Sequence, residues 1–460
     1  MRRFLFASAA ALALVAASGD ARANGRFPES NQIVFGKNEP DLVLVRVTFG
    51  ILVSHDRGQT FDWVCETSIG YTGVEDPMYT VTPSGRYIGS TFQGLTMTSD
   101  KACNWALVGT PQPYIDLAAN PNDAQNVIAL STVYKGQDDA GNVKFASSVA
   151  ETKDEGSTWS DIGPPLDDTI LGHTLDFTAS DPDRLYVTAI RYNGSTPVGL
   201  LYTSKDRGKS WSEQVVPLTG TERAVYIAAV DPLDAEIVYL RTTNNPDKPG
   251  RVILRERNPS GDDGVFRTIF TGLAPLEGFA LTPDGKKVYV GSPLDGVWVA
   301  STADFQFTQK SKVEVKCLAL HGEELWACSN EKIGFIAGVS KDDGATFTSM
   351  LNFCKIRGPL SCPAGSTTET QCPALWAAQR DVLGCDGTTP NPEGGAFTDG
   401  GGFQPPSNGD NAGGGGSCDC QAVLPPSGWS TAGGTLACAL GAAAALFRRR
   451  ARDRKPSPRK

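Results

Sequence analysis

The sequence alternates short apolar segments with tight polar turns over most of its length. Apolar segments such as Leu185–Thr188, Val238–Leu240 and Lys287–Val290 are rich in β-branched and aromatic residues, which favour strands. A turn containing Pro, Asp, Asn or Gly accompanies each segment of this kind. Seven such turns occur, at residues 38–41, 82–85, 120–123, 181–183, 231–234, 282–285 and 321–323. The pattern predicts an all-β protein built from seven repeated units.

A second motif, which we call the Asp turn, recurs with the pattern S/T-x-D-x-G-x-T/S-W/F. Its hydroxyl and carboxylate can bond turn amides, its Gly can adopt a left-handed conformation, and its aromatic residue can pack against a neighbour. Clear copies occupy residues 54–61, 152–159, 204–211 and 340–347, with a weaker copy at 98–105 and a remnant at 301–307. The aspartates of the five recognisable copies are Asp56, Asp100, Asp154, Asp206 and Asp342. A degenerate turn is expected at 261–264 in the fifth unit.

The units are about 38 to 54 residues long and each can be divided into four short strands, which predicts a seven-bladed β-propeller. A β-helix would need shorter coils, and an array of immunoglobulin domains would need units about twice as long. The expected blades cover residues 31–66, 77–108, 114–162, 173–215, 225–270, 277–308 and 314–353. The expected parts of the chain are a signal peptide (1–23), the propeller (24–353), a small disulfide-rich cap (354–386), a Gly/Pro-rich linker (387–417) and a tail (418–460).

The two ends of the chain predict export and anchoring. Residues 1–23 combine an Arg pair, an apolar run and an A-x-A cleavage site, as in a secretory signal peptide. Between this segment and the basic end at 448–460, the chain holds 31 Lys and Arg against 49 Asp and Glu, a net charge of −18. Because phosphate backbones would repel such a body, the charge argues against nucleic acid as a partner. We interpret the acidity mainly as a source of solubility.

Eleven cysteines in an exported chain predict disulfides. We expect four bridges: one between Cys65 and Cys103, one between Cys317 and Cys328, and two within the cap. For the cap, the sequence leaves two pairings open, namely 354–362 with 372–385, or 354–385 with 362–372. The cysteines of the cap are Cys354, Cys362, Cys372 and Cys385. The absence of a C-x-x-C pair leaves a zinc ribbon or thioredoxin-like site without support, and no metal or other cofactor is expected.

The topology of a propeller predicts where a ligand would bind. If strands run outward from the axis, the Asp turns gather on one face, which we call the turn face. The connections between blades and the loops between second and third strands gather on the other, the loop face. Three long segments are expected there, at residues 134–142, 191–195 and 242–248. Residues entering the inner strands near the channel mouth form the candidate ligand-binding set: Asp76, Tyr79, Tyr114, His173, Glu222, Arg223, Tyr226 and Glu277.

Simpler interpretations exist for several of these residues. Asp138, Asp139 and Asn142 could ligate Ca²⁺, but an ordinary hairpin turn is favoured. His173 is interpreted first as a hydrogen-bonded loop residue, and Glu222 with Arg223 as a solvated pair. The sequence has no nucleophile elbow, H-E-x-x-H motif, Walker loop or spaced metal-ligand cluster, so no catalytic residue is assigned.

The Asp turns resemble those of the BNR or Asp-box propellers, a superfamily that includes sialidases, sortilin-type receptors, some xyloglucan-cleaving glycosidases and plant photosystem assembly factors. The resemblance covers about residues 31–353 and implies the fold, while one fold hosts many activities. A sialidase would need an R-I-P-like motif, further arginines, a Tyr nucleophile with a Glu partner, and an Asp acid. Arg26-Phe27-Pro28 matches the first of these only superficially, and no convincing partner set follows.

The tail resembles a MYXO-CTERM sorting signal over about residues 413–452. It has a Gly-rich linker, the Cys418-Asp419-Cys420 motif, an apolar stretch at 436–447 and a terminal Arg cluster. The resemblance implies cleavage by a rhombosortase-like or myxosortase-type protease and a lipid on Cys418, with Cys420 as the second choice. The apolar stretch is short for a membrane span and Cys438 interrupts it. A plain single-span anchor with its basic end inside is the alternative.

These observations favour a monomeric binding or adhesion module, anchored at the outer cell surface, for an extracellular glycan, peptide or matrix. The first alternative is a surface glycoside hydrolase or lyase that uses the same loop face. The second is a scaffold for envelope assembly that binds a partner protein. An acidic pair facing across the channel mouth would favour the enzyme, and a shallow aromatic face without such a pair would favour binding.

Overall fold

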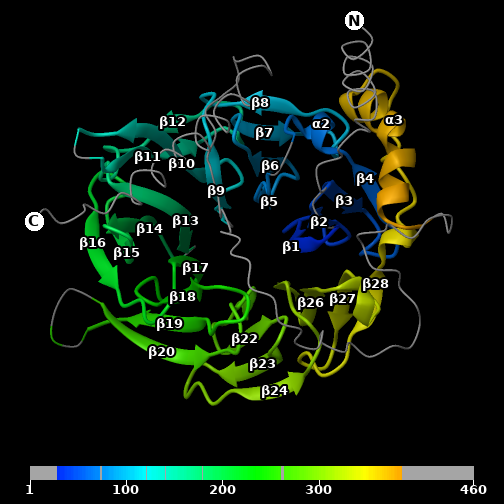
Figure 1. Ribbon diagram of the computed structural model, residues 1–460. Helices are drawn as coiled ribbons and strands as arrows, with labels where there is room; N and C mark the ends of the chain where they lie inside the picture. The colour runs from blue at the N-terminus through cyan, green and yellow to red at the C-terminus, as the bar shows by residue number, and fades with distance from the viewer. Residues whose placement is uncertain are drawn as a thin grey trace, which may run out of the picture. The chain divides into compact units, whose positions relative to one another are not determined.

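The computed structural model describes residues 28–385, except 73–74, 121, 140, 179, 259 and 261–263. It contains seven four-stranded antiparallel sheets arranged as blades around an axis (Figure 1). This confirms the predicted all-β, seven-bladed propeller, and the seven blades begin and end within about three residues of the expected bounds. The predicted signal peptide, Arg26 and Phe27, the linker, and Cys418, Cys420 and Cys438 lie outside the described residues. Among the described helices, none is long and apolar enough to cross a membrane.

Blade 1 contains β1 (Ser30–Phe35), β2 (Val43–Val47), β3 (Gly50–Ser54) and β4 (Asp62–Val64). Blade 2 contains β5 (Tyr79–Val81), β6 (Tyr87–Ser90), β7 (Leu95–Thr98) and β8 (Ala106–Val108). Blade 3 contains β9 (Tyr114–Ala119), β10 (Val127–Gln137), β11 (Val143–Thr152) and β12 (Ser160–Asp161). Blade 4 contains β13 (Ile170–Thr178), β14 (Asp181–Asn193), β15 (Thr196–Ser204) and β16 (Ser212–Val216).

Blade 5 contains β17 (Ala224–Val230), β18 (Val238–Thr243), β19 (Arg251–Glu256) and β20 (Val265–Thr271). Blade 6 contains β21 (Gly278–Leu281), β22 (Lys287–Ser292), β23 (Gly296–Ser301) and β24 (Thr308–Ser311). Blade 7 contains β25 (Cys317–His321), β26 (Glu324–Cys328), β27 (Ala337–Ser340) and β28 (Thr348–Leu351). The helical segments are α2 (Glu66–Ile69), η1 (Glu331–Ile333), η2 (Phe353–Lys355) and α3 (Thr367–Val382).

The cores of the propeller lie between neighbouring blades. All five residues of β2 are buried, because a middle strand is covered by a neighbouring blade on each of its two faces. One core joins the first and last blades through Val45, Leu52 and Trp326. The near-continuous apolar runs in the sequence are therefore middle strands that bury both faces.

The Asp turns join the third and fourth strands, as the topology predicted. In the first copy, Ser54 Oγ donates to Asp56 Oδ1 at 2.7 Å, and Thr60 N donates to the same oxygen at 2.9 Å. Thr60 Oγ1 donates to Asp56 Oδ2 at 2.5 Å. The two residues after the aspartate, Arg57 and Gly58, have φ of 59° and 80°. A Cβ on Gly58 would lie 2.6 Å from the Trp326 ring, so both its conformation and its packing require glycine.

The same bonding recurs in the other four copies. It lowers the pKa of each aspartate, to about 2 for Asp206 and Asp342, because the hydroxyl and amide bonds favour the ionised carboxylate. In the weaker copy Ala102 takes the glycine position with φ of 71°. Of the degenerate fifth turn, 261–263 lie outside the described residues.

Each blade is built from four consecutive strands, so no strand is shared between the first and last blades. The segment after blade 7 instead crosses to blade 1 and pairs with the outer strand β4. Trp63 N donates to Gly358 O at 2.7 Å, and Leu360 N donates to Trp63 O at 2.8 Å. Trp63 and Pro359 form a parallel bridge. We call residues 354–385 the latch, since this segment joins the two ends of the ring (Figure 1).

Four disulfides form, and their pairing corrects part of the prediction. The bridges are Cys65–Cys372, Cys103–Cys362, Cys317–Cys328 and Cys354–Cys385. Cys65 and Cys103 were expected to pair with each other, and Cys362 and Cys372 to pair within the cap. Each blade cysteine instead bonds a latch cysteine, because the latch lies along the outer edges of blades 1 and 2. Two disulfides thus bond the latch covalently to the propeller.

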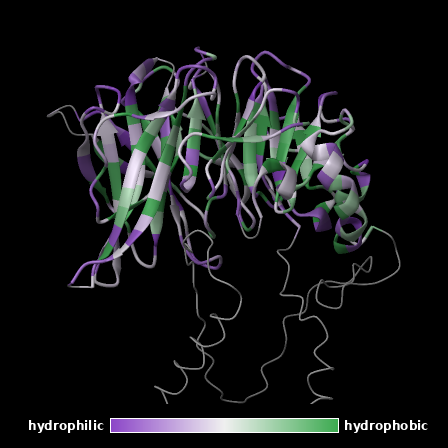
Figure 2. Ribbon diagram, turned by 90° about the horizontal axis from the view of Figure 1, so that it is seen from above, coloured by the Kyte–Doolittle hydropathy of each residue, from purple (hydrophilic) through white to green (hydrophobic). Residues whose placement is uncertain are grey.

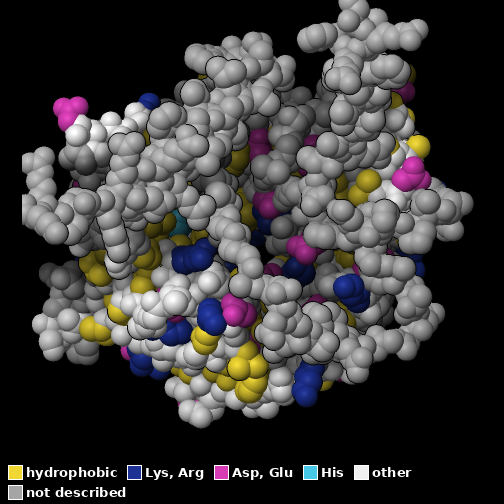
Figure 3. All heavy atoms as spheres, in the orientation of Figure 1, with side chains coloured by type: hydrophobic (Ala, Val, Ile, Leu, Met, Phe, Trp, Pro, Cys, Tyr) yellow, Lys and Arg dark blue, Asp and Glu magenta, His cyan; other side chains and the backbone are white. Residues whose placement is uncertain are grey.

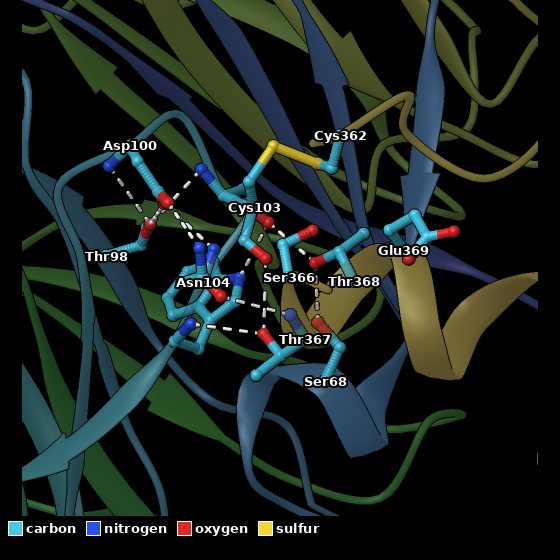
Figure 4. Close-up of a disulfide and its surroundings, with 12 residues drawn as sticks. Ser68, Thr98, Asp100, Cys103, Asn104, Cys362, Ser366, Thr367, Thr368 and Glu369 are labelled. Atoms are coloured by element: carbon cyan, nitrogen blue, oxygen red, sulfur yellow. Dashed lines mark hydrogen bonds between the residues drawn. A yellow bond between two sulfur atoms is a disulfide. The ribbon is translucent and has the colours of Figure 1, made fainter. Parts of the chain in front are cut away.

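The start of α3 binds the second Asp turn beside one of these bridges (Figure 4). Thr368 Oγ1 donates to Ala102 O at 2.7 Å and Thr368 N to Cys103 O at 3.1 Å. Thr367 N donates to Asn104 Oδ1 at 3.1 Å. These bonds and the Cys103–Cys362 bridge hold the one recognisable Asp turn that has alanine in place of glycine.

Candidate binding site on the loop face

Two long hairpins rise on the loop face, in blades 3 and 4. They are formed by β10 with β11 and by β14 with β15, and in Figure 2 the strands on that side of the ring extend past the others. The hairpins present two exposed tyrosines, Tyr134 with an exposed fraction of 44% and Tyr192 with 56%. Tyr134 also meets Phe145 edge to face, with 6.1 Å between ring centroids. Exposed aromatic rings of this kind are typical of binding surfaces.

Ion pairs connect both hairpins to neighbouring segments. Lys144 Nζ lies 3.0 Å from Asp168 Oδ1. Arg191 Nη2 lies 2.7 Å from Glu213 Oε2 and 3.6 Å from Asp167 Oδ2. These surface pairs contribute little stability, but they link each hairpin to a neighbouring strand or loop.

A group of polar and aromatic side chains lies next to the hairpins at the axis. Tyr226 on β17 and Arg241 on β18 are register partners, and the Arg241 Cζ lies 5.1 Å from the Tyr226 ring centroid. His173 stacks on the same tyrosine, with 4.9 Å between centroids and 14° between planes. The register of β13 shifts between Gly172 and Thr174, so a bulge positions the His173 side chain. We call His173, Tyr226, Arg241 and Glu277 the axial group.

The electrostatics of the axial group follow from its partial burial. Desolvation lowers the pKa of His173 to about 4, so the imidazole is neutral at pH 7. Burial raises the pKa of Glu277, against the opposing charges of Lys316 and Arg241. Arg241 Nη1 donates to the Leu276 carbonyl at 3.2 Å. No carboxylate of the described chain forms an ion pair with Arg241, which leaves guanidinium donors for a ligand.

Two buried carboxylates lie deeper on the inner strands. Asp116 on β9 accepts bonds from Leu117 N and Leu175 N, both at 2.9 Å, and Asp176 on β13 accepts one from Phe177 N at 2.8 Å. Desolvation outweighs these bonds and raises the pKa of Asp116 to about 7 and that of Asp176 to about 6. Because Asp116 holds the amide of the next inner strand, it links neighbouring blades. The two carboxylates lie on adjacent strands rather than across the channel mouth.

The structure brings three of the predicted site residues together, namely His173, Tyr226 and Glu277. Figure 3 shows acidic and basic side chains close together near the centre of the ring. Asp76 and Arg223 are exposed on the same face. Burial raises the pKa of the Tyr226 phenol, and Tyr192 on the β14–β15 hairpin adds to this shift.

The other predicted residues have structural roles. Tyr79 and Tyr114 are only 4% and 1% exposed and lie in cores between blades, so they cannot form part of a binding surface. Glu222 is buried and accepts bonds from Arg251 Nε at 2.8 Å and Nη2 at 2.6 Å, and from Thr242 Oγ1. It closes the base of a loop-face hairpin, and the expected solvated pair with Arg223 is replaced by this buried ion pair.

Residues 138–142 form a hairpin turn, as the favoured interpretation predicted. Asn142 N donates to Asp138 Oδ1 at 2.8 Å, and Asn142 Nδ2 donates to Asp138 Oδ2 at 3.0 Å. These bonds close the β10–β11 hairpin. Within the described residues, no group of three His, Cys, Asp or Glu side chains could hold a metal ion.

Sequence reasoning missed Arg241 and Asp116. Each is a charged residue inside an apolar strand, in the segments Val-Tyr-Leu-Arg-Thr-Thr and Tyr-Ile-Asp-Leu-Ala-Ala. A charge at such a position is costly unless it is paired or lines a cavity, so this pattern could have identified both. The pairing of Arg241 with Tyr226 depends on strand register, which the sequence does not reveal.

No family model matches this chain, and no curated protein matches it. Among solved structures, an ancestral GH74 enzyme is 13% identical over 71% of this chain and 55% of its own, with a TM-score of 0.35. The β-propeller domain of Myceliophteria thermophila Cps50 (Swd1) is 10% identical over 66% of this chain and 94% of its own, with a TM-score of 0.40. Pyrococcus horikoshii acylaminoacyl peptidase is 12% identical over 72% and 53%, with a TM-score of 0.43. This chain thus spans about half the length of the first, and such identities concern the fold alone.

Proposed function

We propose that this protein is an exported β-propeller of the BNR or Asp-box type that binds an extracellular glycan or peptide on its loop face. The observation that carries the proposal is the stack of His173, Tyr226 and Arg241 at the axis, on the same face as the exposed Tyr192 of the β14–β15 hairpin. Aromatic faces bind sugar rings and apolar side chains, while the donors of Arg241 can orient a polar group of the ligand. The two tyrosine-tipped hairpins extend this surface away from the axis.

We further propose that the protein is displayed at the outer cell surface as a monomer. The signal-like segment 1–23 and the MYXO-CTERM-like tail support this localisation. In this proposal a sorting protease processes the tail and Cys418 bears the lipid, so the membrane is contacted through the C-terminal anchor alone. The net charge of the body supports a partner other than nucleic acid.

A glycoside hydrolase is the second candidate function, favoured by the raised pKa values of Asp116 and Asp176. Both carboxylates already accept backbone amide bonds, however, which supports a structural role for them. An envelope scaffold would use the loop face for a partner protein. Binding therefore remains the first proposal.

The proposal is tested by measuring binding and turnover with the same purified protein. A glycan array and a panel of surface polysaccharides would detect binding, and fluorogenic glycosides would detect hydrolysis. We expect binding without turnover, and loss of binding in Tyr192→Ala. Turnover that disappears in Asp116→Asn or Asp176→Asn would contradict the proposal and establish the hydrolase. Absence of both, with capture of an envelope protein by the loop face, would favour the scaffold.

A further inference from the structure

A cavity of about 320 Å³ opens at the axis on the turn face, opposite the loop face. Its walls come from the ends of four inner strands, β25, β1, β5 and β9, which belong to consecutive blades around the ring. The residues used below are Phe35, Lys37, Thr80, Val81, Leu320 and His321. The volume lies at the lower end of the range of about 300–1,000 Å³ that is typical of small-molecule sites, so it suits a ligand of one or two rings.

One side of the cavity is formed by two aromatic rings that stack on each other. Phe35 of blade 1 and His321 of blade 7 stack in parallel, with 4.6 Å between ring centroids and 9° between planes. The Phe35 ring is held in place by Trp326, which it meets edge to face with 5.6 Å between ring centroids. Val81 and Leu320 add further apolar surface. A ligand with an apolar face would therefore find a fixed, partly desolvated wall.

Polar groups without partners lie on two different walls. The His321 ring nitrogens and the Thr80 hydroxyl make no hydrogen bond within the described part of the chain, although both residues are half-buried. Burial and the nearby Arg57 lower the pKa of His321, so at pH 7 its neutral ring offers one donor and one acceptor. Thr80 on the other side offers a hydroxyl that can do the same. Such groups, half-buried and unpartnered, suit a ligand with several hydroxyls.

The charge at the cavity disfavours cationic ligands. Among its described lining residues only Lys37 is charged, and Lys37 Nζ donates to Asn122 Oδ1 at 3.5 Å. A cation inside would therefore have no opposite charge among these residues. An aromatic ligand such as a phenol would have one hydroxyl at most, and could satisfy only one of the two polar walls.

We propose that this cavity is a second binding site, which takes a neutral hexopyranose as a free sugar or as the end of a glycan chain. The apolar face of the sugar packs against the stacked rings of Phe35 and His321 and against Val81 and Leu320, and its hydroxyls bond His321 and Thr80. The site is separate from the loop-face site in location and in residues. The two proposals can therefore fail independently.

The test is saturation-transfer NMR on the purified full-length chain with the methyl glycosides of glucose, galactose and mannose. We expect transfer to the ring protons of at least one glycoside. Thr80→Val keeps the shape of the side chain but removes its hydroxyl, and His321→Phe keeps the stacked ring but removes its nitrogens. Each variant should weaken the affinity about three- to tenfold, the loss expected for one hydrogen bond. Val215→Ala, at an exposed position of the outer strand β16 that belongs to neither proposed site, serves as the control and should leave this affinity unchanged.

Three results would overturn the proposal. One is absence of transfer to all three glycosides, and another is an unchanged affinity in a folded Thr80→Val variant. The third is binding of phenol or indole that none of the three glycosides displaces. If His321→Phe fails to fold, as judged by its melting transition, Thr80→Val and His321→Gln keep the test decisive. A loss of sugar binding in Tyr192→Ala alone would assign the sugar to the loop face and also contradict this site.

Discussion

Replacing Cys103 and Cys362 by serine is expected to destabilise the propeller and to weaken the contact between its first and last blades. The latch bonds blades 1 and 2 through Cys65–Cys372 and Cys103–Cys362, and no strand is shared between blades 1 and 7. These two bridges are therefore the covalent closure of the described ring. Their effects on stability are coupled, because each bridge shortens the loop that the other closes.

The expected cost follows from the loop that each bridge closes. While Cys65–Cys372 stays intact, breaking Cys103–Cys362 opens a loop of about 48 residues, for which the chain-entropy relation gives about 4 kcal/mol at 25 °C. Removing the second bridge then frees a loop with a sequence separation of 307 and costs about 6 kcal/mol more. Loss of both should therefore exceed the sum of the two single losses by about 2 kcal/mol.

Urea unfolding of the three latch variants would measure these values, and hydrogen exchange would locate the loosening. We expect faster exchange in β1 and in blade 7 when both bridges are absent. A variant without Cys317–Cys328, whose bridge spans only 11 residues inside blade 7, should lose protection only locally and serves as the control. The reasoning is refuted if a variant lacking both latch bridges unfolds at the wild-type urea concentration, or if its exchange resembles that of the control.

Three further predictions concern single side chains. Because burial raises the folded-state pKa of Asp116 from 3.8 to about 7, its protonated form favours folding, and this stabilisation is lost as pH rises from about 4 to about 7. Urea midpoints at pH 4.5 and 7.5 should therefore differ less in Asp116→Asn than in wild type. Glu222→Ala should cost about 3 kcal/mol in urea unfolding, because it leaves Arg251 without its buried partner. Asp56→Ala should lower the melting temperature in a thermal scan, because it removes the acceptor of three turn hydrogen bonds, whereas the exposed Asp139→Ala should not.

The sequence predicted the blades because the signals involved are local. Each Asp turn contains its own donors and acceptors within eight residues, so the third-to-fourth strand turn can be identified without tertiary contacts. The short apolar runs similarly specify middle strands buried on both faces. Repetition of both signals fixed the number of blades and the order of their strands.

The latch and the axial group depend on contacts that leave no local signal. Cys65 and Cys372 are 307 positions apart, and nothing near either cysteine indicates its partner. Arg241 reaches Tyr226 only through the register of two strands, and His173 stacks on the same ring from another blade. Tyr79 was predicted at the channel mouth, but it faces a core between blades, since alternate residues of an inner strand point in opposite directions.

The measurement that tests the central claim most directly uses the strongest glycan or peptide ligand that the simple methyl glycosides do not displace. Its affinity is measured for three proteins: wild type, Tyr192→Ala and Thr80→Val. If the loop face is the main binding surface, Tyr192→Ala should weaken binding at least tenfold, while Thr80→Val on the turn face should match wild type. Equal affinities for all three proteins, each shown to be folded by its melting transition, would contradict the account.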